Sequence, residues 1–102
     1  MDLTGRTALV TGGSGDIGAA ISMALAKLGA NVLVHTYQNL KAAKLVVEGI
    51  KKLGKNAKIL QANLLKREEV FRMSDEILSM GSLDILVNNA GTPIKRVPWE
   101  EL

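Results

Sequence analysis

The sequence predicts an α/β fold built on a doubly wound parallel sheet. Four short apolar runs alternate along the chain with three segments in which apolar residues recur at helical spacing. The connections between these segments are short, so each strand is expected to join the next through a right-handed crossover, which makes the strands parallel. The runs are apolar throughout, as expected for strands that helices cover on both faces.

The first half of the chain is expected to hold two strands with one helix between them. The run TALVT at 7–11 contains β-branched residues and ends in glycines, which suits a buried strand. NVLVHT at 31–36 is the second expected strand, and Gly29 just before it is expected to cap the C-terminus of the helix. That helix is indicated by one apolar face with i, i+3 and i+4 spacing: Ile17, Ala20, Ile21, Ala24, Leu25 and Leu28.

The second half is expected to add two strands and two helices. AKILQA at 57–62 and LDILVN at 83–88 are the expected strands, and KREEVFRMSDEILSM at 66–80 is an expected helix. The other helix ends near Leu53 and Gly54, and its apolar face is formed by Leu40, Ala43, Val47 and Ile50.

This order of elements matches part of a Rossmann-type sheet, in which the four strands would lie in the order 3-2-1-4. Ligands bind such sheets at the carboxyl ends of the strands, where the strand order reverses, which here falls between strands 1 and 4. Three segments rich in glycine or asparagine converge on that end: 11–18, 35–39 and 88–92. The ligand site is therefore expected there.

Composition excludes several classes of protein. The 102 residues suffice for one small domain, and the absence of cysteine excludes a disulfide scaffold or a thiolate metal site. The net charge of +3 is spread along the chain and aromatic residues make up only 3%, so no nucleic-acid partner is expected. The N-terminus lacks the basic and apolar pattern of a secretion signal, and no apolar run approaches the ~20 residues of a membrane span. A cytoplasmic protein without membrane contact is expected.

The stretch TGGSGDIG at 11–18 joins the first strand to the first helix. Glycines in this position let the backbone approach a pyrophosphate, and the helix N-terminus offers free N–H groups and the positive end of a dipole. The stretch fits two known spacings. As TGxxxGxG it has Asp16 in place of the middle glycine, whereas as TGxxGxxG it is complete with Gly12, Gly15 and Gly18. The alternative is a plain tight turn.

Four pieces of the sequence resemble the N-terminal part of the short-chain dehydrogenase/reductase family. They are LTGRTALVTGG, the glycine loop, QANL and SLDILVNNAG at 82–91. The pattern is closest to the 3-oxoacyl-[acyl-carrier-protein] reductases. The resemblance implies an NAD(P)-dependent oxidoreductase that transfers hydride between carbonyl and alcohol groups, with a small carbonyl or acyl-thioester substrate and a homo-oligomeric full-length form.

The resemblance also implies a set of cofactor-binding residues and favours one of the two spacings. NNAG after the fourth strand is not normal for the longer, epimerase-type subfamily, which also usually keeps an acid at the end of strand two. The shorter subfamily is therefore the interpretation, with an epimerase-type relative and a non-catalytic dinucleotide-binding module as alternatives. The implied cofactor-binding residues are Gly12, Ser14, Gly15, Asp16, Ile17, Gly18, Tyr37, Asn63, Leu64, Asn89, Ala90 and Gly91.

The segment after the second strand favours NADP over NAD. An Asp or Glu there would bind the ribose 2′-hydroxyl of NAD, but positions 35–39 read HTYQN and carry no acid. No arginine is present to bind a 2′-phosphate, although Lys41 can supply charge, and Gly15 stands where NADP-preferring relatives often have a basic residue. NAD therefore stays possible. Asn63 replaces the family's usual aspartate, and its amide oxygen can accept the same hydrogen bond from the adenine amino group.

The family's catalytic residues are expected to lie beyond this sequence. They are a Tyr-x-x-x-Lys pair, a serine and often an asparagine, and the segment 92–102 resembles the loop that leads to the asparagine. Tyr37 and Lys41 have the right spacing but follow strand two, on the adenosine side, so no catalytic residue is assigned. The 102 residues are interpreted as the cofactor-binding part, inactive alone. His35 has no metal-binding cluster around it and is expected to end a strand beside the cofactor.

Asp16 is expected to point away from the phosphate. A carboxylate about 5 Å from a phosphate charge would cost roughly 3 kcal/mol at an effective dielectric constant near 20. Serving instead as the N-cap of the helix, it would stabilise by about 1 kcal/mol. We therefore expect Asp16 to be the N-cap, and Gly15 to make the close backbone approach to the cofactor.

Overall fold

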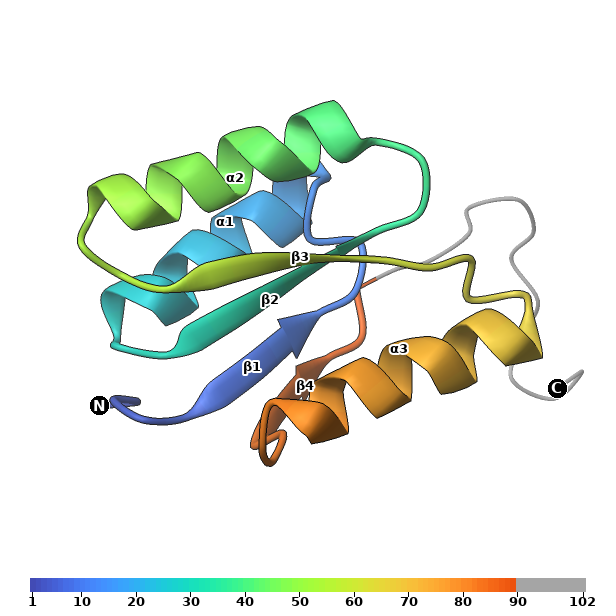
Figure 1. Ribbon diagram of the computed structural model, residues 1–102. Helices are drawn as coiled ribbons and strands as arrows, with labels where there is room; N and C mark the ends of the chain where they lie inside the picture. The colour runs from blue at the N-terminus through green and yellow to red at the C-terminus, as the bar shows by residue number, and fades with distance from the viewer. Residues whose placement is uncertain (90–102) are drawn as a thin grey trace, which may run out of the picture.

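The computed structural model describes residues 1–89, which form a four-stranded parallel sheet in the order β3-β2-β1-β4 with three helices (Figure 1). The predicted fold class and strand order are both confirmed. The elements are β1 (Thr7–Val10), α1 (Asp16–Lys27), β2 (Asn31–Thr36), α2 (Leu40–Lys52), β3 (Ala57–Gln61), α3 (Arg67–Ser79) and β4 (Ile85–Val87). Three of the predicted strands are longer than the observed ones by one residue or more.

The central strand is β1, which pairs with β2 on one side and with β4 on the other. The register runs from Thr7 opposite Asn31 to Val10 opposite Val34, and Val10 also lies opposite Val87. The carboxyl ends of these three strands therefore lie at the same end of the sheet. The segments that follow these strands meet at this end of the sheet, as the strand order predicts.

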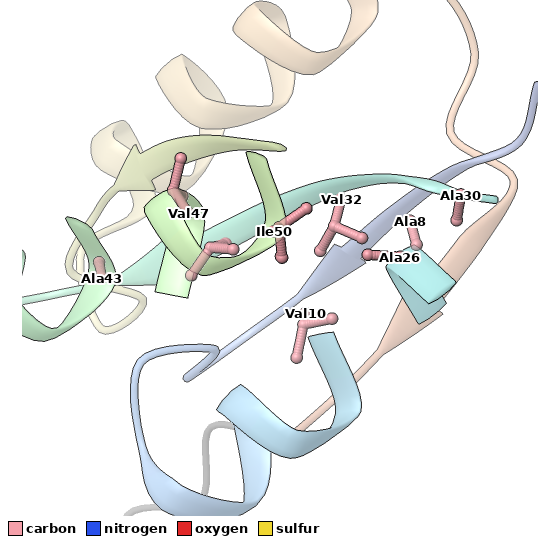
Figure 2. Packing of buried hydrophobic residues seen from close by; sticks show 9 residues of the cluster. Ala8, Val10, Ala26, Ala30, Val32, Ala43, Val47 and Ile50 are labelled. Carbon is pink, nitrogen blue, oxygen red and sulfur yellow. The ribbon is translucent and has the colours of Figure 1, made fainter. Parts of the chain in front are cut away.

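Helices cover both faces of the sheet. α1 and α2 lie together on one face and α3 lies on the other (Figure 1). The core beneath α1 and α2 contains buried side chains from β1, β2 and both helices, among them Val10, Ala26, Val32, Val47 and Ile50 (Figure 2). Side chains alternate across each strand, so the second core, beneath α3, contains Leu9, Leu33, Leu60, Ala62, Met73 and Ile77.

The end of α1 confirms the predicted glycine cap. The helix ends at Lys27 with Leu28 as C-cap, and Gly29 follows in the left-handed region with a φ of +104°. The N–H of Ala30 donates to the carbonyl of Leu25, which satisfies an end-of-helix carbonyl. This turn brings the chain directly into β2.

The face of the sheet under α3 remains partly uncovered in the described residues. Leu86 on β4 is 61% exposed, and Phe71 and Leu78 on α3 are also largely exposed. Within residues 1–89, β4 pairs only with β1 and so forms one edge of the sheet. Among the described residues, this edge strand therefore exposes an apolar side chain.

Candidate functional site

The segment between β1 and α1 folds tightly against neighbouring backbone, and glycine is required at several of its positions. Gly12 has a φ of +64°, in the left-handed region that favours glycine. A Cβ on Gly18 would overlap the carbonyl oxygen of Gly12 and lie 2.9 Å from Nδ2 of Asn89. A Cβ on Gly13 would lie 3.0 Å from both the Val10 carbonyl oxygen and Cγ1 of Val34. The loop and the first turn of α1 are thus packed backbone against backbone.

Gly15 is under no such restriction. Its φ is −75°, it is exposed, and a Cβ there would have only an ordinary contact of 3.7 Å with the Gly12 carbonyl oxygen. The two glycine spacings share Gly12 and Gly18, and these are the positions with a steric need for glycine. The spacing that also includes Gly15 gains no steric support from this loop.

The prediction that Asp16 caps α1 is wrong. The N-cap is Gly15, with φ −75° and ψ 172°, and no side chain caps the helix. Asp16 is the first helical residue, because the helix begins one residue earlier than the prediction allowed. Its exposed carboxylate lies in the first turn, where a negative charge is favoured by the helix dipole by about 0.3–1 kcal/mol.

The first turn of α1 leaves backbone amides available to a ligand. The N–H groups of Asp16, Ile17 and Gly18 have no carbonyl one turn earlier in the helix, whereas the N–H of Ala19 donates to the Gly15 carbonyl oxygen at 2.7 Å. Such N–H groups, together with the positive end of the helix dipole, form a binding site for anions. The position at the carboxyl ends of β1 and β4 is where ligands bind open α/β sheets.

β2 holds the glycine loop from one side. The Gly12 N–H donates to Nδ1 of His35 at 3.0 Å, and the Gly13 N–H donates to the carbonyl oxygen of His35 at 2.9 Å. The Ser14 hydroxyl donates to Oγ1 of Thr36 at 3.1 Å. His35 is therefore a buried partner of the loop, a role that the sequence analysis did not find because its partner lies 23 residues away.

The end of β4 holds the loop from the other side. Asn89 donates from Nδ2 to the Gly12 carbonyl oxygen at 3.2 Å, and its own N–H donates to Oγ1 of Thr11 at 2.9 Å. The Thr11 N–H donates to the carbonyl oxygen of Val87 at 3.1 Å. Asn89 is thus brought against the glycine loop, as expected. Ala90 and Gly91 lie outside the described residues.

The turn after β3 lies on the far side of β2 from the loop. Asn63 accepts the N–H of Leu65 on its side-chain oxygen at 3.0 Å, and its N–H donates to Oε1 of Glu69 at 2.9 Å. Asn63 therefore acts as a turn residue at the start of the segment leading to α3. Its amide oxygen retains a second lone pair. Leu64 packs against the core beneath α3.

Tyr37 and Lys41 lie at the turn from β2 into α2. Tyr37 is 47% exposed, and its carbonyl oxygen accepts from Nε2 of Gln61 at 3.1 Å. Lys41 is exposed in the first turn of α2. Among residues 1–89, no group of three or more His, Cys, Asp or Glu side chains could hold a metal ion, and no helix is long and apolar enough to cross a membrane.

Comparison with known proteins assigns the family. The family model described as short chain dehydrogenase matches residues 6–102. The chain belongs to the short-chain dehydrogenase/reductase family. The sheet order, the glycine loop and the asparagine at the end of β4 are thus those of a member of this family, whose enzymes are oxidoreductases acting on carbonyl and alcohol groups.

Similar proteins include bacterial and fungal reductases. The chain is 46% identical over 87 residues to the 3-oxoacyl-[acyl-carrier-protein] reductase of Staphylococcus aureus, covering 84% of this chain and 35% of that protein. It is 44% identical over 101 residues to a hydroxynaphthalene reductase-like protein of Metarhizium robertsii, covering 98% of this chain and 38% of that protein. This short-chain dehydrogenase/reductase chain therefore spans little more than a third of the length of these relatives.

Solved structures of the family have the same fold. A short chain dehydrogenase from Burkholderia cenocepacia, in complex with NADP, is 41% identical with a TM-score of 0.84, covering 100% of this chain and 42% of that one. A metagenomic short-chain oxidoreductase in complex with NADP is 34% identical with a TM-score of 0.85, covering 88% of this chain and 41% of that one.

Proposed function

We propose that residues 1–102 form the cofactor-binding part of an NAD(P)-dependent reductase of carbonyl groups, with NADP as the preferred cofactor. The observation that carries this proposal is the glycine loop fixed between β2 and β4, with the free amides of the first turn of α1 at the end of the sheet. A dinucleotide has a pyrophosphate, which carries the negative charge that these amides suit.

The pyrophosphate would bind to the N–H groups of Asp16, Ile17 and Gly18. Gly12 and Gly13 already donate their N–H groups to His35, so they would contribute close approach of the backbone but no free donor. Ser14 and Gly15 lie between these two groups of residues and complete the loop. We propose that Gly15 makes the nearest backbone contact and that the Asp16 carboxylate points away from the phosphates.

The adenosine half would bind across the ends of β2 and β3. Asn63 and Leu64 would contact the adenine, and Tyr37 would lie beside its ribose. Residues 35–39, at the end of β2 and just after it, include no acid, so a 2′-phosphate meets no carboxylate from this segment, which supports NADP. The similar structures in complex with NADP support the same preference, while a similar 7α-hydroxysteroid dehydrogenase complexed with NADH keeps NAD as an alternative.

The bound cofactor would supply a hydride to a carbonyl carbon. A 3-oxoacyl thioester is the substrate class we favour, because the Staphylococcus aureus relative is named for that reaction. No residue of this chain is assigned to proton transfer, so we propose that residues 1–102 alone have no reductase turnover. We also propose a cytoplasmic, homo-oligomeric full-length enzyme.

Titration of the chain with NADPH, followed by the fluorescence of the reduced nicotinamide, tests the cofactor proposal. We expect saturable binding that competes with NADP. A Gly18→Ala variant should lose this binding, because the methyl group would force the loop away from the first turn of α1. Gly49→Ala on α2 is the matched control, since its added methyl group would meet only the flexible end of the Met23 side chain, at 3.1 Å, away from the loop. Equal binding by both variants would contradict the proposed pyrophosphate site.

A further inference from the structure

The imidazole of His35 is buried at the end of β2 and is hydrogen-bonded through both ring nitrogens. The residue is 3% exposed. Nδ1 accepts the N–H of Gly12 at 3.0 Å, and Nε2 lies 2.9 Å from the carbonyl oxygen of Ala62. An amide N–H can only donate and a carbonyl oxygen can only accept, so the bonded ring is neutral with its hydrogen on Nε2.

These two hydrogen bonds join segments that are not neighbours in the sheet. Gly12 belongs to the glycine loop after β1, whereas Ala62 follows β3, and β2 lies between those strands. Ala62 is directly followed by Asn63 and Leu64, the residues proposed to contact adenine. The ring of His35 therefore reaches from the proposed pyrophosphate loop to the proposed adenine side.

We propose that His35 is a positioning residue that couples these two parts of the cofactor site. Backbone hydrogen bonds already tie β2 to both sides, through Gly13 to the His35 carbonyl and through Ala62 to the Thr36 carbonyl. The ring adds a bond to Gly12, where the chain turns with a φ of +64° toward the first turn of α1. Movement of the adenine-side turn is thereby transmitted to the loop. This inference rests on the proposed cofactor function.

Three substitutions separate the two hydrogen bonds. In His35→Asn the side-chain oxygen can take the place of Nδ1 and keep the bond from Gly12, while the bond to Ala62 is lost. In His35→Gln the amide nitrogen can take the place of Nε2 and keep the bond to Ala62, while the bond from Gly12 is lost. His35→Phe fills the same space and makes neither bond.

Calorimetric titrations with NADPH and with adenosine 2′-monophosphate, which lacks a pyrophosphate, test the coupling. We expect His35→Gln and His35→Phe to weaken NADPH binding at least about fivefold, with less than about a twofold effect on the monophosphate. His35→Asn should recover part of the NADPH affinity. Equal losses for both ligands in all variants, or unchanged NADPH binding by His35→Phe, would overturn the coupling. A wild-type chain that fails to bind NADPH would instead refute the proposed function.

A spectroscopic measurement on the unmodified chain keeps the test decisive if the variants fail to fold. His35 is the chain's single histidine, so its ring ¹⁵N signals need no assignment. We expect the neutral ring with hydrogen on Nε2, and we expect added inorganic pyrophosphate to shift both the ring signals and the Asn63 amide. A ring with hydrogen on Nδ1 would overturn the proposal. So would a backbone N–H signal of Asn63 whose chemical shift does not change when pyrophosphate is added.

Discussion

At the scale of single residues, the glycine loop divides into positions that need glycine and positions that do not. Gly12 needs its positive φ, and Gly18 has no space for a side chain. Gly15 has an ordinary extended conformation, and a Cβ there would make only an ordinary contact with the Gly12 carbonyl oxygen. The apparent conflict between the two sequence spacings therefore concerns only positions 15 and 16, where side chains are tolerated sterically.

Gly15→Ser should stabilise the protein. Serine is a preferred N-cap residue, and the φ and ψ of Gly15 suit an N-cap. Replacing glycine also lowers the entropy of the unfolded chain, so we expect the free energy of unfolding to rise by about 0.5–1 kcal/mol. Urea denaturation measures this change. Gly18→Ala serves as the opposite control and should lower the unfolding free energy by about 1–3 kcal/mol. A destabilising Gly15→Ser would show that the loop conformation depends on glycine there.

Asp16→Gly should change the affinity for NADPH by less than about tenfold. A carboxylate that points away from the phosphates has only a weak, solvent-screened effect on them. Titration of NADPH into a full-length enzyme and its Asp16→Gly variant measures this effect. A gain near a hundredfold, which corresponds to about 3 kcal/mol, would show that the carboxylate faces the phosphates.

At the scale of elements, the site depends on how strand ends hold the loop. β2 and β4 each contact the glycine loop through residues at their carboxyl ends, so the position of the first turn of α1 is set from both sides. α2 is linked to these bonds through its N-cap residue, Asn39. The N–H of Asn39 donates to Oγ1 of Thr36, the β2 hydroxyl oxygen that also accepts from Ser14. The conformation of the glycine loop is therefore held mainly by hydrogen bonds to residues at the ends of strands.

Asn89→Ala should loosen the loop from β4. The substitution removes the donor to the Gly12 carbonyl oxygen, and we expect the free energy of unfolding to fall by about 1–2 kcal/mol, with weaker NADPH binding. Thermal denaturation and NADPH titration measure the two effects. Asn56→Ala is the control, since it removes an exposed amide–amide hydrogen bond near the other end of the sheet and should leave NADPH binding unchanged. Parallel losses in both variants would argue against a specific role of Asn89.

The sequence was sufficient to predict the elements but not the contacts between them. Hydrophobic periodicity reports which residues face the core, so the bounds of β2 were predicted correctly. The strand order was predicted correctly from the order of strands and helices along the chain, which matches a Rossmann-type sheet. The N-cap was wrong because the pattern does not reveal how many loop residues stay extended before a helix begins. His35 was missed as a partner of the loop because its bonds span 23 and 27 residues, and a lone histidine has no local signal for such partners.

At the scale of the whole molecule, the two faces of the sheet differ in how well they are covered. α1 and α2 bury one face with a continuous core, whereas α3 leaves Leu86 of β4 exposed on the other. Phe71 and Leu78 are further exposed apolar residues, on α3. Apolar surface next to an unpaired strand edge favours association between chains.

Leu86→Lys should increase the monomeric fraction of residues 1–102. A charged residue on an edge strand opposes edge-to-edge association, and Leu86 is already 61% exposed, so the unfolding free energy should change by less than about 0.5 kcal/mol. Analytical ultracentrifugation measures the monomeric fraction. Leu45→Lys on α2 is the control, because Leu45 is similarly exposed but lies on a helix that packs against β2 and β3, away from the β4 edge. An equal effect of both variants would show that general charge, and not the edge, controls association.

The loop that joins β1 to α1 also contains two kinds of backbone amide with different access to water. The Gly12 and Gly13 amides are bonded to a buried residue of the sheet, so their hydrogens should exchange with solvent as slowly as those of the core strands. Within residues 1–89, the N–H groups of Asp16, Ile17 and Gly18 have no carbonyl one turn earlier in the helix, so they should exchange quickly until an anion covers them. Exchange at Gly12 and Gly13 would therefore report unfolding of the sheet, and exchange in the first turn of α1 would report whether an anion occupies the site.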